Sequence, residues 1–164
     1  MRKKDLLLEE YGESHLDHTN KTIHWFCIPL IVFSLMGLLS SIPADIINQF
    51  FPDFIKSYIS WASIFLFFTF LYYLRLSISL ALGMLIFSLL CIIGNLWLSN
   101  NITLPLWETS LIIFTIAWIG QFVGHKIEGK KPSFLKDIQF LMIGPSWLMS
   151  FILKKLKLVI RLAF

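Results

Sequence analysis

The stretch PLWETSLIIFTIAWIGQFVGHKIE, residues 105–128, decides the fold class of this chain. Between Glu108 and Lys126 it contains no Asp, Glu, Lys or Arg. An ionised side chain at the centre of a bilayer costs about 3 kcal/mol on insertion scales, so a charge-free run of this length predicts a membrane-spanning helix. Pro105 is tolerated where a helix starts, and Glu108 suits the positive end of the helix dipole. We therefore expect a span over residues 105–125.

The composition extends this prediction to the whole chain. Of the 164 residues, 57% are hydrophobic and only 15% are charged, whereas soluble domains contain about 25% charged residues. A domain of this size cannot hide 16 Phe and 6 Trp from water. The sequence therefore predicts an all-α, polytopic membrane helical bundle, with residues 1–164 as a single membrane domain.

Charge-free windows give the other spans. We expect them at about residues 22–44, 57–74 and 78–98, which makes four transmembrane helices. A fifth window, residues 138–153, is too short to cross and contains Gly144-Pro145, so we expect a re-entrant or interfacial helical hairpin there. Residues 1–21 are interpreted as an amphipathic cytoplasmic segment and residues 154–164 as a tail on the membrane surface.

The positive charges favour four crossings over five, because Lys and Arg near span ends stay on the cytoplasmic side. With four crossings and a cytoplasmic N-terminus, Lys56 alone of the 14 Lys and Arg residues lies outside. A fifth crossing would export the four cations of residues 154–161. Both termini are therefore predicted to be cytoplasmic, and we expect the protein in a bacterial inner membrane.

Several other function classes find no support in the sequence. Cys27 and Cys91 both lie in apolar runs, which argues against a disulfide framework. The sequence lacks the basic stretches with interleaved aromatic residues that would indicate nucleic-acid binding. The expected partner is membrane lipid, and the oligomeric state stays open.

All four histidines are predicted to lie at one face of the membrane. His15, His18 and His24 come just before or at the start of the first span, and His125 ends the fourth. An even number of crossings brings both ends to the same side, here the cytoplasmic interface. If residues 1–21 form a helix, His15 and His18 continue an apolar stripe through Leu8 and Tyr11.

Neighbouring polar and small residues favour convergence of these imidazoles. Gln121, His125 and Glu128 share one side of the fourth helix, and Gly120 and Gly124 leave room for another helix to approach. Asn20 is a good N-cap for the first span, so a turn there can direct His24 towards the same point.

Three imidazoles and an open position suit zinc or iron. We expect His15, His24 and His125 to be the first ligands, with His18 as the weakest candidate. Gln121 and Glu128 are candidates for a further ligand or, with Asn20 and Tyr11, for residues that orient the ligands. The cations Lys126 and Lys130 suit lipid headgroups or, beside a metal, a substrate carboxylate.

The combined pattern resembles a known family. It is similar to that of the small membrane proteins named for the metabolism of phytosphingosine to odd-numbered fatty acids. The similarity lies in three stretches: Tyr11-Gly-Glu-Ser-His15, Asn20-Lys-Thr-Ile-His24 with Pro29, and Gln121-Phe-Val-Gly-His125 with Glu128, Pro132 and Gly144-Pro145. The resemblance covers nearly the whole chain. It implies an Fe(II)-dependent dioxygenase of fatty acid α-oxidation, which uses O₂ to shorten a 2-hydroxy fatty acid by one carbon. His15, His24 and His125 match the motif positions, whereas His18 has no counterpart and Glu128 follows its histidine one residue earlier than in the fungal form.

Other functions are compatible with the same residues. A zinc-dependent lipid hydrolase would use Glu128 or Glu13 as general base. A non-enzymatic haem carrier would ligate iron through one N-terminal histidine and His125. In a membrane scaffold, all four histidines would only anchor helices at the interface.

Overall fold

A computed structural model describes residues 3–56, 59–135 and 139–163, and all regular secondary structure in these ranges is helical. Outside these ranges lie Ser57 and Ile138, which start two of the expected windows. The first two residues of the N-terminal segment and the last residue of the tail also lie outside them. In chain order the helices are α1 (Lys3–Glu13), α2 (His18–Ser40), α3 (Asp45–Asn48), α4 (Asp53–Lys56), α5 (Trp61–Leu76), α6 (Ile78–Asn101), α7 (Leu106–Glu128), the 3₁₀ turn η1 (Ser133–Leu135) and α8 (Phe140–Ala163).

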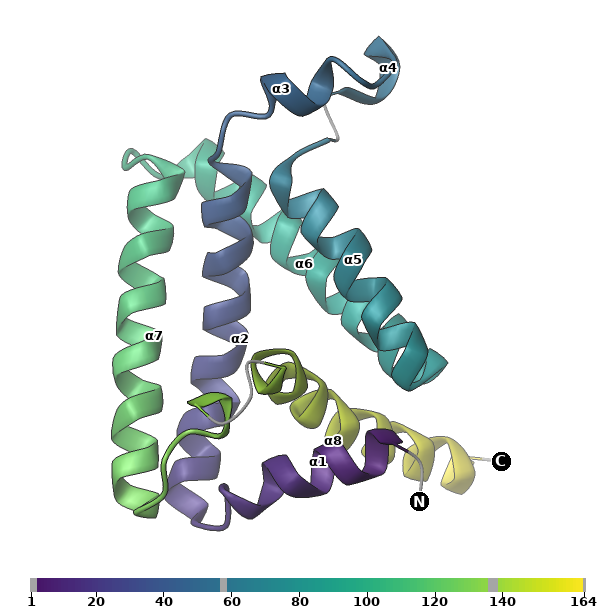
Figure 1. The fold of residues 1–164 in the computed structure, drawn as a ribbon, viewed down its shortest axis with the longest axis vertical. Coiled ribbons are helices and arrows are strands. Elements are labelled where there is room, and N and C mark those ends of the chain that lie inside the picture. The colour runs from purple at the N-terminus through teal and green to yellow at the C-terminus, as the bar shows by residue number, and fades with distance from the viewer. Residues whose placement is uncertain (1–2, 57–58, 136–138, 164) are drawn as a thin grey trace.

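Helices α2 and α7 form an antiparallel pair, and α5 and α6 form a second, inclined pair beside it (Figure 1). The short helices α3 and α4 lie at one end of the bundle. Helices α1 and α8 lie across the opposite end, where both termini are also found (Figure 1). The end formed by α1 and α8 also receives the start of α2 and the end of α7, which carry His24 and His125.

Each of the four expected spans coincides with a helix. Three of these helices, α2, α6 and α7, are long and apolar enough to cross a membrane. Helix α5 is apolar but has 16 residues, about 24 Å at 1.5 Å per residue. The described chain is therefore all-helical with three membrane-length helices, and the crossing by α5 stays a prediction.

The first long helix begins earlier than expected. Its N-cap is Asp17, whose carboxylate accepts hydrogen bonds from the backbone N–H groups of Thr19 and Asn20 at 2.8 and 2.9 Å. The prediction that Asn20 caps this helix is therefore wrong. A carboxylate interacts more strongly than an amide with the positive helix end, and the Asn20 side chain is left for other contacts.

The expected stripe of Leu8, Tyr11, His15 and His18 on one helix is also wrong. Helix α1 ends at Glu13, and the chain turns before α2 begins at His18. Hydrogen bonds from Ser14 and His15 backbone N–H groups to the carbonyls of Tyr11 and Gly12 close this turn. His15 therefore lies in the turn between two helices, where its ring can leave the direction of α1.

Residues 140–163 form one continuous helix, α8, where a hairpin was expected. Pro145 removes a single helical hydrogen bond donor, and tertiary contacts outweigh that loss. Ile143, Trp147 and Leu148 of α8 are buried in a core cluster that they share with α1, and Tyr73 donates a hydrogen bond to the Met142 carbonyl at 2.8 Å. The Gly144-Pro145 pair therefore lies inside a packed helix.

The close approach of α2 and α7 depends on two glycines, as the sequence predicted. A Cβ atom at Gly124 would lie 2.5 Å from Oδ1 of Asn20, and one at Gly120 would lie 2.6 Å from Sγ of Cys27. These two helices make the most extensive contact of the fold. Their packing places the end of α7 beside the start of α2.

Candidate metal centre

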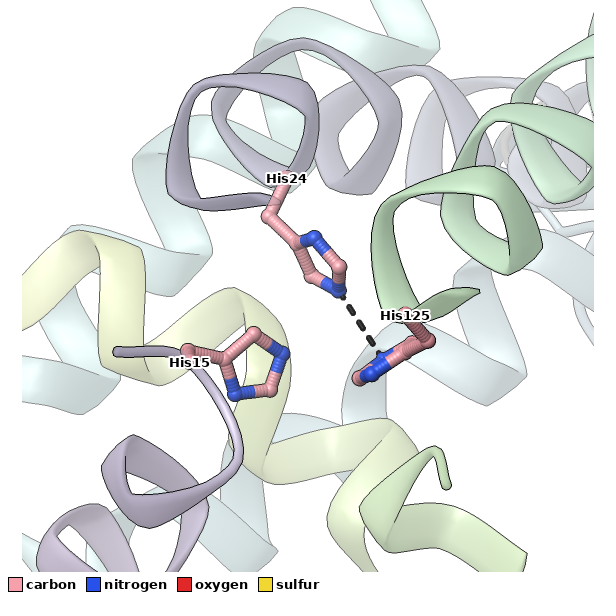
Figure 2. A group of neighbouring side chains, drawn as sticks. All are labelled: His15, His24 and His125. Atoms are coloured by element: carbon pink, nitrogen blue, oxygen red, sulfur yellow. Dashed lines mark hydrogen bonds between the residues drawn. The ribbon is translucent and has the colours of Figure 1, made fainter. Parts of the chain in front are cut away.

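Three histidines from distant parts of the chain meet at the end of the bundle that α1 and α8 cover. His15 comes from the turn after α1, His24 from the second turn of α2 and His125 from the last turn of α7 (Figure 2). All three are buried, and a ligand nitrogen from each lies within 4.8 Å of the others. Ligands of an ion with bonds of about 2.1 Å lie at most about 4.2 Å apart. A small rotation of the rings is therefore sufficient to hold one metal ion.

Backbone carbonyls orient two of these rings. His15 Nδ1 donates to the Tyr11 carbonyl at 2.7 Å, and His24 Nδ1 donates to the Asn20 carbonyl at 2.9 Å. A carbonyl oxygen only accepts, so each neutral ring carries its proton on Nδ1 and its lone pair on Nε2. This is the arrangement that metal-binding histidines use, with the second nitrogen bonded to a carbonyl.

The nitrogens that face one another are incompletely satisfied by the protein. Nε2 of His24 and Nε2 of His125 lie 3.2 Å apart, whereas Nε2 of His15 is buried with no hydrogen-bond partner among the described residues (Figure 2). An unsatisfied buried polar atom costs about 1–3 kcal/mol. A cation accepts the lone pair of such a nitrogen, so the donor set fits a metal ion.

Burial keeps His15 neutral. The ring is 1% exposed, and Tyr11 stacks on it with ring centroids 4.3 Å apart. In the metal-free chain, desolvation lowers the pKa of His15 to about 4. Burial likewise raises the pKa of the Tyr11 phenol. His15 therefore offers a free lone pair at neutral pH without first losing a proton.

The sequence profile of a family described as "2-hydroxy-palmitic acid dioxygenase Mpo1-like" matches residues 1–156. The chain belongs to this family. No curated protein and no solved structure matches the chain. The Mpo1-like family is named for a dioxygenase, and this member contains a buried histidine group that can bind a metal ion.

In this Mpo1-like chain, Glu128 holds the turn that carries His15. Its carboxylate accepts hydrogen bonds from the backbone N–H groups of Leu16 and Asp17 at 3.0 and 2.8 Å. It also accepts one from Nδ2 of Asn20 at 3.1 Å. The carboxylate thus joins the end of α7 to the start of α2, and its oxygens are engaged by these donors.

The remaining candidate residues are less directly placed. His18 is exposed at the first position of α2 and lies outside the group of three. Gln121 is buried one turn from His125 and lines the adjoining cavity. Lys126 and Lys130 are exposed, and Lys130 donates to the Glu13 carbonyl at the end of α1.

Two further features of the site were not predicted from the sequence. Trp147 of α8 packs beside the site, with its ring centroid 5.3 Å from that of His15. Hydroxyl groups of Ser14 and Ser133 hydrogen bond across the site. Pro132 lies next to Ser133, and Gly144 lies three residues before Trp147. This nearness to the family-like motifs is the only hint that the sequence offered.

Proposed function

We propose that the chain is an Fe(II)-dependent, non-haem dioxygenase of fatty acid α-oxidation, which cleaves a 2-hydroxy fatty acid to an acid one carbon shorter using O₂. The observation that carries the proposal is the buried group of His15, His24 and His125 in a member of a family named for 2-hydroxy-palmitic acid dioxygenase. Three imidazoles leave coordination positions for substrate and O₂.

Substrate chemistry fits a site of this kind. The hydroxyl and carboxylate of a 2-hydroxy acid can chelate one metal ion through a five-membered ring, and hard oxygen donors suit Fe(II). A bound Fe(II) ion would supply the one-electron chemistry that lets O₂ react with a closed-shell substrate. His15, His24 and His125 would hold it, and the Tyr11 and Asn20 carbonyls would fix the orientation of two of these rings.

The overall reaction balances without another reductant. One 2-hydroxy acid and one O₂ give the shortened acid, CO₂ and water. The C1–C2 bond breaks, C1 and C2 together lose four electrons, and O₂ gains four. A cofactor such as a nicotinamide or a 2-oxo acid is therefore unnecessary.

Surrounding residues suit oxidation of an amphiphilic acid. Tyr11, Phe140 and Trp147 are buried beside the site and exclude water. We propose that the exposed Lys126 and Lys130 attract the substrate carboxylate to the same end of the bundle. The site would then face the cytoplasm from a bacterial inner membrane.

The direct test measures O₂ uptake and acid products with purified protein, Fe(II) and 2-hydroxyhexadecanoate. We expect pentadecanoate to form with one O₂ consumed per product. His125→Ala should reduce the rate at least a hundredfold, because it removes one of three ligands. His18→Ala is the matched control, since His18 is exposed and outside the group, and it should retain the wild-type rate.

The same preparation tests the alternatives. Imidazole sites bind zinc more tightly than Fe(II), so a zinc-dependent lipid hydrolase is a specific rival. Ester or amide cleavage with zinc and without O₂ would support that rival, and a Soret band would support a haem carrier. Wild-type O₂ uptake by His125→Ala would contradict the iron site.

A further inference from the structure

A cavity of about 480 Å³ adjoins the histidine group and extends into the bundle. At its near end it is lined by Tyr11 and His125, and at its far end by Leu35, Met36 and Phe114. This volume is typical of small-molecule sites. The cavity therefore reaches His125 of the candidate metal centre.

The cavity is long and follows two helices. Along α7 its lining residues recur every three or four positions, from His125 through Gln121 and Trp118 to Phe114. His125 and Phe114 are eleven residues apart, about 16 Å along a helix. One leaflet of a hydrocarbon core of about 30 Å is about 15 Å deep. The cavity is thus about as long as a membrane acyl chain.

The cavity wall is mostly apolar. Two of its polar side chains use their hydroxyl groups elsewhere: Thr69 donates to the Leu66 carbonyl at 3.0 Å and Tyr73 to the Met142 carbonyl at 2.8 Å. Part-exposed side chains such as Leu35, Phe114 and Trp118 line the cavity, which is open along one side. A cavity of this size and character is expected to take an apolar ligand.

We propose that this cavity binds the acyl chain of the 2-hydroxy acid and that its far end limits the chain length. The inference rests on the proposed function for the position of the acid group, which would lie at the histidines. The acyl chain would then lie in this cavity against the protein instead of being dispersed among the surrounding lipids. An acyl chain longer than the space between the histidines and the far end at Leu35 and Phe114 must bend or withdraw its acid group from the site.

Substitutions at the far end test the length limit. In Leu35→Phe we expect a shorter cavity, and the ratio of kcat/KM for the 16-carbon over the 12-carbon 2-hydroxy acid should fall about tenfold or more. In Phe114→Ala we expect the ratio for 20 over 16 carbons to rise similarly. Leu30→Phe and Ile116→Ala are the controls, because both residues are exposed on the same two helices and neither lines the cavity. Neither control should alter the chain-length profile.

A binding measurement separates this inference from catalysis. Trp118 lines the cavity, so a brominated hexadecanoic acid should quench its fluorescence in the metal-free protein in nanodiscs. The saturable part of the quenching should disappear in Trp118→Phe and weaken in Leu35→Phe. Non-saturable quenching, together with one chain-length profile for all four variants, would overturn the inference even if O₂ uptake is normal. Saturable, length-dependent quenching without any O₂ uptake would support the cavity and contradict the proposed reaction.

Discussion

At the scale of single residues, Glu128 is the strongest candidate for a positioning residue. It touches none of the three rings directly in the described contacts, yet its carboxylate binds Leu16, Asp17 and Asn20. Hydrogen bonds to a charged group contribute about 1.5–3 kcal/mol each. Glu128 thereby fixes the turn before α2, and with it the position of His15.

We expect Glu128→Gln to weaken metal binding about tenfold, as loss of a supporting contact around a metal ligand typically does. The amide N–H₂ would face one of the two backbone N–H groups, so a hydrogen bond is replaced by a donor–donor contact. Anaerobic titration with Fe(II) measures the change. Glu108→Gln, at the opposite end of α7, is the control and should titrate as wild type. Unchanged affinity in Glu128→Gln would exclude the positioning role.

The sequence predicted which histidines meet but not how each is held. Helical spacing and the predicted even number of crossings were enough to predict that His24 and His125 meet, because both arguments concern long helices. Asp17 and Asn20 compete as N-caps, and with Asp17 as the cap of α2 the chain turns at residues 14–17. His18 then lies exposed at the start of α2, outside the group. Such local competition is decided by side-chain contacts that no spacing reveals.

At the scale of elements, the α2–α7 pair determines whether the candidate site can form. Gly124→Ala should separate these helices, since the new Cβ would lie 2.5 Å from Oδ1 of Asn20, which is fully buried. Overpacking of this kind costs about 1–3 kcal/mol. Thermal unfolding in detergent should show a Tm lower by about 2–4 °C per kcal/mol. Gly12→Ala is the control, because its nearest contact would be an ordinary 3.5 Å to Trp147, and an unchanged Tm in Gly124→Ala would contradict this role for the glycine.

A second junction between elements could not be predicted. Gly37 of α2 meets the buried side chains of Asn95 on α6 and Ser110 on α7, near the end of the bundle that α3 and α4 occupy. Asn95 also donates to the Phe33 carbonyl of α2 at 2.9 Å. Small residues and polar contacts are common where membrane helices pack, but the pairing of three separate helices depends on their tilt. The continuity of α8 through Pro145 similarly follows from its packing against α1, which the local sequence does not contain.

At the scale of the whole molecule, the path of the chain argues that α5 crosses the membrane. Helix α2 ends, and α7 begins, at the end of the bundle near α3 and α4, whereas α6 starts at the other end (Figure 1). The chain must therefore return between Ser40 and Ile78, and α5 is the only described helix long enough to do so. Its length of about 24 Å is short for a core of about 30 Å, and bilayer thinning of a few ångströms accommodates such a mismatch.

The predicted four crossings would place the two ends of the bundle on opposite sides of the membrane, and the positive charges near the span ends predict which end is cytoplasmic. We expect Asp53→Cys in α4 to react with a membrane-impermeant maleimide added to intact cells, because its side chain is exposed at the end away from the histidines. Glu13→Cys, exposed at the end of α1 beside the site, should react only after the membrane is permeabilised. The unmodified chain is the control for Cys27 and Cys91, which lie inside apolar helices. Labelling of both positions from the same side would mean that α5 does not cross. Labelling of Glu13→Cys in intact cells, with Asp53→Cys labelled only after permeabilisation, would place the histidine group on the outer face, away from cytoplasmic fatty acids and iron.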